Sequence, residues 1–133
     1  MSEALTATRA ALAGQTAWLV GGAVRDRLLG RDIDDLDVVV DEDPRVAARA
    51  LAGAVGGAAF KLSGEFGAWR VVAPQGKWQV DVLALAGPGI EEDLARRDFT
   101  VNAIAEPLAG GEAIDPFGGA DDARRGRLRM VSP

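Results

Sequence analysis

Apolar residues in the first 30 positions recur in short runs that glycines separate. Residues 3–12 carry them at helical spacing and stop before Gly14, which predicts a first helix. Residues 18–20 (Trp-Leu-Val) predict a buried strand, and residues 23–29 have one apolar face, which suits a helix that Gly30 closes. The pattern therefore predicts a strand, a turn containing two glycines, and a helix.

The remaining hydrophobic pattern alternates between strand-like and helix-like segments. Further strands are predicted at 35–40, 68–73, 77–85, 100–105 and 112–115, helical segments at 44–51, 91–97 and 121–125, and a hairpin turn at 74–76. No repeat or long linker divides the chain. We therefore expect one domain over residues 1–133, of class α+β, with a small mixed β-sheet flanked by helices.

Composition excludes several classes of protein. Of the 133 residues, 48% are hydrophobic and 26% charged, which is enough apolar material for a core and excludes a disordered or collagen-like chain. No apolar run approaches the ~18 residues of a membrane span, and the acidic N-terminus lacks the features of a secretory signal. The expected location is cytoplasmic.

The absence of cysteine and histidine narrows the chemistry. It excludes disulfides, thiolate nucleophiles and the common zinc sites, and it removes the most frequent general base. Catalysis would depend on carboxylates, arginines, lysines or hydroxyls, and a metal would be a hard cation such as Mg²⁺. The net charge of -5 argues against a free-standing nucleic-acid coat.

Gly21, Gly22 and Arg25 form the first candidate site, at the predicted junction of strand and helix. Glycines let backbone N–H groups approach a phosphate, and an arginine one turn into the helix can form a bidentate contact. The alternative is a tight turn with a surface pair between Arg25 and Asp26. Taken alone, the motif favours that alternative, because glycine pairs before helices are common.

Asp35 and Asp37 form the second candidate site. Residues two apart on a strand point to the same face, roughly 6.5 Å apart, so the two carboxylates can converge while Leu36 enters the core. Such a pair suits two metal ions, the arrangement used in phosphoryl and nucleotidyl transfer. A solvated acidic turn is an equally good reading, because more aspartates flank the pair.

Asp81 is the third candidate, because it lies in the middle of a predicted interior strand. An ionised carboxylate there must be paired or bound to a metal, and an antiparallel pairing with the strand of Asp35 and Asp37 would supply the partner. The alternative is an Asp that faces solvent on an edge strand, since Gln79 would share its face.

Residues 91–102 are the fourth candidate. Pairs such as Glu92 with Arg96 and Asp93 with Arg97 explain much of this segment as an exposed helix. They leave Asp98 and Asn102 unexplained, two polar groups able to bind a ribose or a base edge.

Together these motifs resemble a known family. Residues 21–31, 35–37 and 96–103, followed by 115–119 and 127–129, resemble the head domain of bacterial class II tRNA nucleotidyltransferases (CCA-adding enzymes) and poly(A) polymerases. The motifs have the family's order and spacing, and the resemblance covers roughly residues 15–131. It implies a polymerase-β-like nucleotidyltransferase fold.

The resemblance also implies roles for individual residues. Asp35 and Asp37 would hold two Mg²⁺ ions, one lowering the pKa of the attacking RNA 3'-hydroxyl and the other gripping the nucleotide phosphates. Asp81 would be the third carboxylate, and residues 63–67 a mobile loop near the site. Gly22 and Arg25 would contact the triphosphate, and Arg97 would also reach the nucleotide. Asp98 and Asn102 would position the ribose, and Gly21 is a further expected nucleotide-binding residue.

The implied substrates are ATP or CTP and the 3' end of tRNA. In the family a helical neck that selects the base follows the head, together with body and tail domains that hold tRNA, whereas this chain stops at residue 133. We therefore expect a truncated form of a longer enzyme. Three readings stay open: an enzyme head, a domain that binds Mg²⁺ and nucleotide without transfer, and a purely structural acidic turn. CCA addition, partial addition and poly(A) synthesis are not distinguished.

Overall fold

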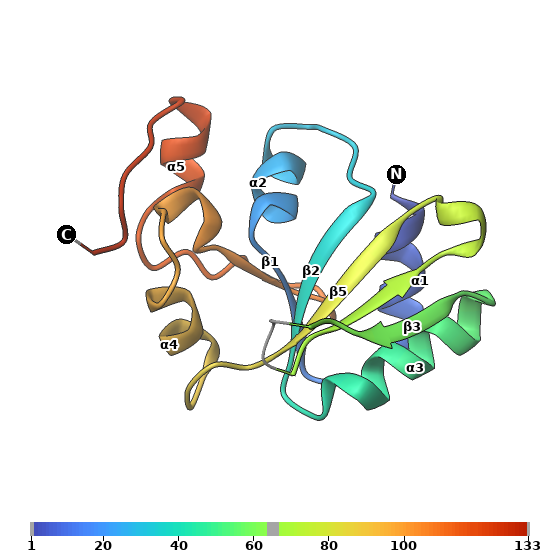
Figure 1. Cartoon of the computed structure of the whole chain (residues 1–133). Coiled ribbons are helices and arrows are strands. Elements are labelled where there is room, and N and C mark those ends of the chain that lie inside the picture. Colours follow the sequence, from blue (N-terminus) through green and yellow to red (C-terminus); the bar gives the residue numbers. More distant parts are fainter. Residues whose placement is uncertain (1, 64–66, 133) are drawn as a thin grey trace.

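A computed structural model describes residues 2–63 and 67–132 as a mixed sheet flanked by helices (Figure 1). This confirms the predicted α+β class. Residues 64–66, in the middle of the expected mobile loop, lie outside the described residues. The strands are β1 (Ala17–Val20), β2 (Asp35–Val40), β3 (Ala58–Lys61), β4 (Trp69–Val72), β5 (Gln79–Ala84) and β6 (Ala105–Pro107). The helices are α1 (Glu3–Ala11), α2 (Gly22–Leu28), α3 (Pro44–Val55), α4 (Ile90–Ala95), α5 (Gly119–Arg124) and two short 3₁₀ helices, η1 (Pro74–Gly76) and η2 (Thr100–Asn102).

The six strands are ordered β3-β4-β5-β2-β1-β6. β2 and β5 run parallel, and the other neighbouring pairs run antiparallel. The predicted hairpin is confirmed, because β4 and β5 pair antiparallel across η1. β2 and β5 are both interior strands, so their side chains have neighbours on either side.

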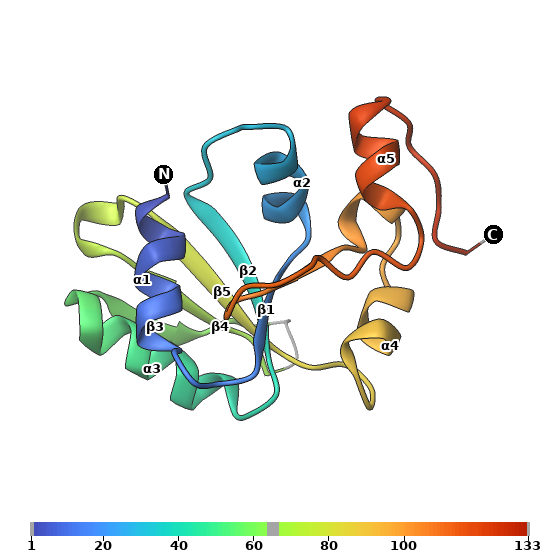
Figure 2. The same cartoon turned by 180° about the vertical axis from the view of Figure 1, so that it is seen from behind.

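Each face of the sheet has its own apolar cluster. Leu36, Val38 and Val40 of β2 face the larger cluster, which α1, α2 and α3 cover. Val39 faces the smaller cluster, which includes Ile90 and Leu94 of α4. Figures 1 and 2 show α1 and α3 together at one side of the molecule and α4 and α5 at the other. Asp35 and Asp37 share the face of Val39, because alternate residues of a strand point the same way.

Capping explains where α3 begins and ends. The Asp43 carboxylate accepts a hydrogen bond from the backbone N–H of Arg45 at 3.0 Å, and Pro44 occupies the first turn. The helix closes at Gly56, which has a left-handed conformation with φ of +71°. It therefore extends one turn beyond the predicted end at Leu51.

Three details of the predicted strands are wrong. Residues 100–102 form η2 and the strand starts only at Ala105, because Thr100 and Val101 are both buried in a tight turn. The predicted strand at 112–115 is reduced to a single bridge between Ala105 and Ile114. β3 was not predicted, since it is an edge strand with mostly exposed residues and gives no alternating signal.

Among the described residues, every helix falls short of the length and apolar character that crossing a membrane requires.

Candidate active site

The turn between β1 and α2 lies directly against two candidate side chains. Gly21 has a φ of +73°, a conformation that favours glycine. A Cβ atom at Gly21 would lie 3.5 Å from Oδ2 of Asp37 and 3.8 Å from Nη1 of Arg97. The tertiary structure therefore brings the glycine turn, the carboxylate and the arginine together from three separate segments.

Arg25 lies over the first turn of α2. A Cβ atom at Gly22 would be 3.0 Å from its Nη2 atom, so the absence of a side chain at Gly22 leaves room for the guanidinium. Arg25 donates through Nε to Asp26 at 3.2 Å, as the surface-pair alternative expects. It also donates through Nη1 to Oδ1 of Asn102 at 3.5 Å, which joins two of the sequence-predicted residues.

Asp35, Asp37 and Asp81 lie on one face of the sheet. Asp37 pairs with Asp81 in the register of β2 and β5, and Asp35 pairs with Gln79. The prediction that the strand of Asp81 runs antiparallel to that of Asp35 and Asp37 is wrong, since the two strands are parallel. The cause is the chain path: β3 and β4 are inserted at the edge, and the hairpin then returns β5 to the side of β2.

Asp81 has a protein partner. Arg70, opposite it on β4, donates through Nε to Oδ1 at 2.7 Å and through Nη2 to Oδ2 at 3.0 Å. The hydrogen bond and charge of Asp81 raise the pKa of Arg70, and the charges of Asp35 and Asp37 add to the effect. Arg70 was not predicted as a site residue, although its place in a hairpin opposite Asp81 was a usable signal.

The acidic residues of this face fit a hard cation by their chemistry. Asp35 and Asp37 offer carboxylate oxygens, the donors that Mg²⁺ prefers, from one side of one strand. Within residues 2–63 and 67–132, no group of three or more acidic side chains is close enough to hold a metal ion. The described geometry thus provides a pair of carboxylates, with Asp81 held by Arg70.

Arg97 is held by a buried carboxylate that was not predicted to be buried. Asp93 is 5% exposed, accepts from Nη2 of Arg97 at 3.2 Å, and accepts from the backbone N–H of Ala86 at 2.8 Å. Asp93 was predicted to lie on an exposed helix. Its burial could have been predicted from the helical face that it shares with Ile90 and Leu94, which are both buried.

Asp98 stands apart from the other candidates. Its side chain is exposed and accepts a hydrogen bond from the backbone N–H of Phe99 at 2.8 Å. In the described part of the chain it has no hydrogen bond or ion pair with Arg25, Arg97 or Asn102. The geometry therefore joins Asn102 to the glycine turn but leaves Asp98 facing solvent.

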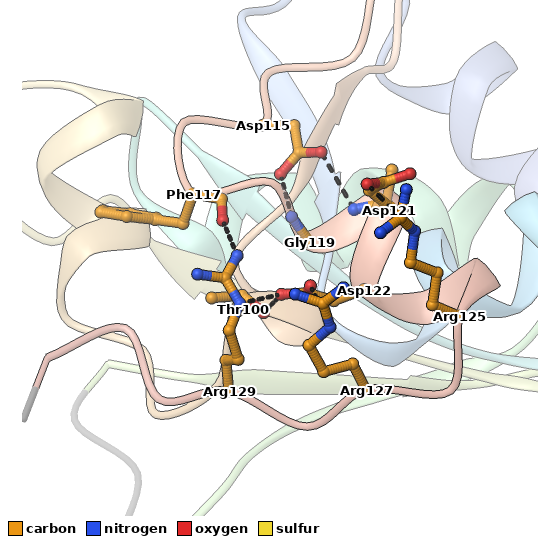
Figure 3. A network of polar contacts seen from close by, with 10 residues as sticks. Thr100, Asp115, Phe117, Gly119, Asp121, Asp122, Arg125, Arg127 and Arg129 are labelled. Carbon is orange, nitrogen blue, oxygen red and sulfur yellow. Dashed lines mark hydrogen bonds and ion pairs between the residues drawn. The ribbon is translucent and has the colours of Figure 1, made fainter.

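A second polar network supports the segment that carries Asn102 (Figure 3). Asp122, on α5, is 2% exposed and accepts from Oγ1 of Thr100 at 2.6 Å and from Nε of Arg129 at 2.8 Å. The hydrogen bond from Thr100 lowers the pKa of Asp122, the charges of Arg129 and Arg127 lower it further, and burial opposes them. This carboxylate is a structural anchor between η2, α5 and the C-terminal segment.

The start of α5 is fastened in the same network. Asp115 accepts from the backbone N–H groups of Gly119 at 2.7 Å and Ala120 at 3.0 Å. A Cβ atom at Gly119 would lie 1.9 Å from the carbonyl oxygen of Thr100, so α5 approaches η2 more closely than any larger residue permits. The motif at 115–119 therefore holds η2 in place.

A mixed sheet with two carboxylates on one strand, beside a glycine turn and two arginines, is the arrangement expected of a nucleotidyltransferase head. The sequence profile of the poly A polymerase head domain matches residues 17–129. The chain therefore belongs to that family, which includes the tRNA nucleotidyltransferases.

Relatives with two different specificities match the chain. It is 54% identical over 116 residues to the A-adding tRNA nucleotidyltransferase of Deinococcus radiodurans, covering 87% of this chain and 26% of that enzyme. It is 41% identical over 128 residues to the CC-adding tRNA nucleotidyltransferase of Geobacter sulfurreducens, covering 96% and 30%.

A solved structure described as a CCA-adding enzyme with CTP superposes with a TM-score of 0.84 at 29% identity, covering 97% of this chain and 34% of that one. This confirms the expected fold. The chain thus spans about a quarter to a third of the length of the relatives that it matches.

Proposed function

We propose that this chain is the catalytic head of a template-independent RNA nucleotidyltransferase. It transfers CMP or AMP from CTP or ATP to the 3' end of tRNA, with release of pyrophosphate. The observation that carries the proposal is the approach of Gly21 to both Asp37 and Arg97, which brings a phosphate-type glycine turn, one carboxylate of the pair and a guanidinium together.

Asp35 and Asp37 are the proposed ligands of two Mg²⁺ ions. When bound, the ions supply the Lewis acidity that displacement at a phosphate requires. The two carboxylates share one face of β2, and that of Asp37 lies next to the glycine turn, so a cation held by this pair would be near the phosphates of a nucleotide bound at the turn. Asp81 completes the set as the third carboxylate of the proposal.

The proposed nucleotide site surrounds the turn. Gly21 and Gly22 leave the backbone open to the triphosphate, and the guanidinium of Arg97 lies near Gly21 while that of Arg25 lies near Gly22. Asn102 is held beside Arg25 and is assigned to the ribose, with Asp98. The buried carboxylate of Asp93 orients Arg97.

The proposed RNA substrate rests on the relatives. They are named A-adding and CC-adding tRNA nucleotidyltransferases, and the superposed CCA-adding enzyme is described with CTP. Because relatives of both specificities match this head, the proposal covers CMP and AMP alike.

Thermal unfolding with ligand tests the site. The melting temperature is measured without ligand, with Mg²⁺ alone, and with Mg²⁺ plus ATP or CTP, for the native chain and for the double variant Asp35→Ala/Asp37→Ala. A matched control, Asp41→Ala/Glu42→Ala, removes two exposed acidic charges just beyond the other end of β2.

Ligand binding to the folded state raises the melting temperature by mass action. A rise that requires Mg²⁺, disappears in Asp35→Ala/Asp37→Ala and persists in the control supports the metal–nucleotide site. The same rise in melting temperature in both double variants would contradict the proposed metal–nucleotide site. Incorporation of labelled CMP or AMP into a tRNA 3' end then separates an active head from a domain that binds nucleotide without transfer.

A further inference from the structure

Arg70 and Asp81 form a bidentate ion pair on the acidic face of the sheet. Both carboxylate oxygens of Asp81 accept a hydrogen bond from the same guanidinium, at 2.7 and 3.0 Å. The arrangement is bidentate and crosses directly between paired positions of β4 and β5. The side chains are partly shielded, with 33% of Arg70 and 18% of Asp81 exposed.

The charge of Arg70 acts on more than one carboxylate. Arg70 lies opposite Asp81 in the register of β4 and β5, and Asp81 lies opposite Asp37 in the register of β5 and β2. Arg70 therefore lies within the electrostatic field of the same carboxylates that form the proposed metal site. Three acidic side chains on one face repel one another, and a central cation relieves that repulsion.

We propose that Arg70 is a built-in counter-ion that competes with divalent metal for the acidic face and sets its metal affinity by holding Asp81. This inference rests on the proposed function, since it assigns metal binding to Asp35 and Asp37. Arg70 is a positioning residue, because it acts through Asp81.

Both the geometry and the charge of Arg70 oppose the recruitment of Asp81 by a metal ion. While Arg70 holds both oxygens of Asp81, that carboxylate is directed along the sheet toward β4. A divalent cation that recruits Asp81 must break two charged hydrogen bonds and approach a fixed positive charge. Removal of one such charge beside a cation site is expected to tighten binding by about tenfold.

Mn²⁺ titration by calorimetry tests the inference, with inorganic Mn²⁺ alone as the probe. Arg70→Gln removes the charge and retains a polar side chain, Arg70→Met repeats the test without hydrogen bonds, and Arg70→Lys preserves the charge. The double variant Arg70→Gln/Asp81→Asn removes the carboxylate that the inference releases. Circular dichroism of each variant establishes that it is folded before titration.

We expect Arg70→Gln and Arg70→Met to bind Mn²⁺ about tenfold more tightly than the native chain. Arg70→Lys is expected to stay within a few-fold of the native affinity, and the double variant to lose most of the gain. If only one of these two neutral variants folds, the Mn²⁺ affinity of that variant decides the test. Unchanged or weaker Mn²⁺ binding in folded neutral variants would overturn the inference, as would a gain that persists without Asp81.

The Asp35→Ala/Asp37→Ala variant separates this inference from the proposed function. If the native chain binds Mn²⁺ and that variant does not, the metal site holds, and the Arg70 series then decides the inference alone. If neither the native chain nor any Arg70 variant binds Mn²⁺, the proposed metal site and the inference fail together.

Discussion

Asp122 and Asp35 are both aspartates of this domain, yet their surroundings are opposite. Asp122 is 2% exposed and accepts hydrogen bonds from a threonine and an arginine, with a second arginine 3.6 Å away. Asp35 is exposed, and its carboxylate has no hydrogen bond or ion pair to any residue that the structure describes. The first holds the chain together, whereas the second faces outward with two further acids on its face of the sheet.

The difference shows how the surroundings of a carboxylate distinguish structure from function. A buried charge is tolerated where donors within the protein satisfy it, and its removal then affects folding. A carboxylate grouped with others and left open to solvent adds repulsion to the folded state, so folding alone does not explain its position. Substitutions in the two regions should therefore affect different measurements.

The largest expected effect is a loss of stability from Gly119→Ala, in the structural network. The new methyl group would lie 1.9 Å from the carbonyl oxygen of Thr100, and a backbone atom cannot move aside cheaply. Unfolding in urea should show a loss of about 3 kcal/mol. Gly53→Ala is the control, because its methyl meets nothing within 4 Å inside α3 and should stabilise by about 0.5–1 kcal/mol. Equal stabilities for the two variants would contradict the close approach of α5 to η2.

The second largest expected effect is that of Asp122→Asn, which should lower the melting temperature by roughly 5 °C or more at pH 7. The folded-state pKa of Asp122 is lowered, chiefly by Thr100, so its contribution is fully present above the ordinary aspartate pKa of about 3.9. It is lost as the pH falls through the lowered value. Melting curves from pH 7 to pH 2 should show a smaller acid-induced loss in the variant. Parallel profiles would mean that Asp122 is not an ionised anchor.

Gly21→Ala should lower both the stability of the fold and the binding of Mg²⁺ and nucleotide. A positive φ at a non-glycine residue costs about 1–3 kcal/mol, and the methyl would enter the space between Asp37 and Arg97. Gly30→Ala is the matched control, with the same φ of +73° and nothing within 4 Å. Urea unfolding should show losses in both variants, while the rise in melting temperature with Mg²⁺ and ATP should shrink only in Gly21→Ala. Equal shrinkage in the control would remove Gly21 from the proposed site.

The smallest expected change in stability is that of Asp35→Asn, within about 0.5 kcal/mol of the native chain without metal. The substitution removes one of three like charges on a face of the sheet and breaks no hydrogen bond among the described residues. The same variant should lose the stabilisation by Mg²⁺ and nucleotide in melting experiments. If Asp35→Asn instead destabilised the metal-free chain as strongly as Asp122→Asn, the distinction between the two regions would fail.

Local pattern predicted most of the elements that build this domain. The run of Val38, Val39 and Val40 after alternating aspartates predicts a central strand, and all three valines are completely buried. Gly21 and Gly22 predict the turn before α2, and Pro44 predicts the start of α3. These predictions hold because periodicity, glycine conformation and proline geometry act over a few neighbouring residues.

Local pattern did not predict which elements pack against one another. Residues 100–105 have the composition of a strand, but burial of Thr100 against Asp122 makes the first three a 3₁₀ helix. Asp93 has the spacing of a surface ion pair, yet it is buried beneath Arg97. In both cases the deciding partner is supplied by packing between elements, which local pattern does not register.

The sequence by itself determined which chemistry is available to this protein. Without cysteine or histidine, the site must be built from carboxylates, arginines and glycines, and the motifs that carry them identify the family. Only the tertiary structure decided which carboxylates stand together and what neutralises each, because the parallel pairing of β2 with β5 sets Asp37 opposite Asp81. The hairpin then places Arg70 against Asp81. Electrostatic interaction depends on distance in space, and residues far apart in sequence meet only once the sheet has formed.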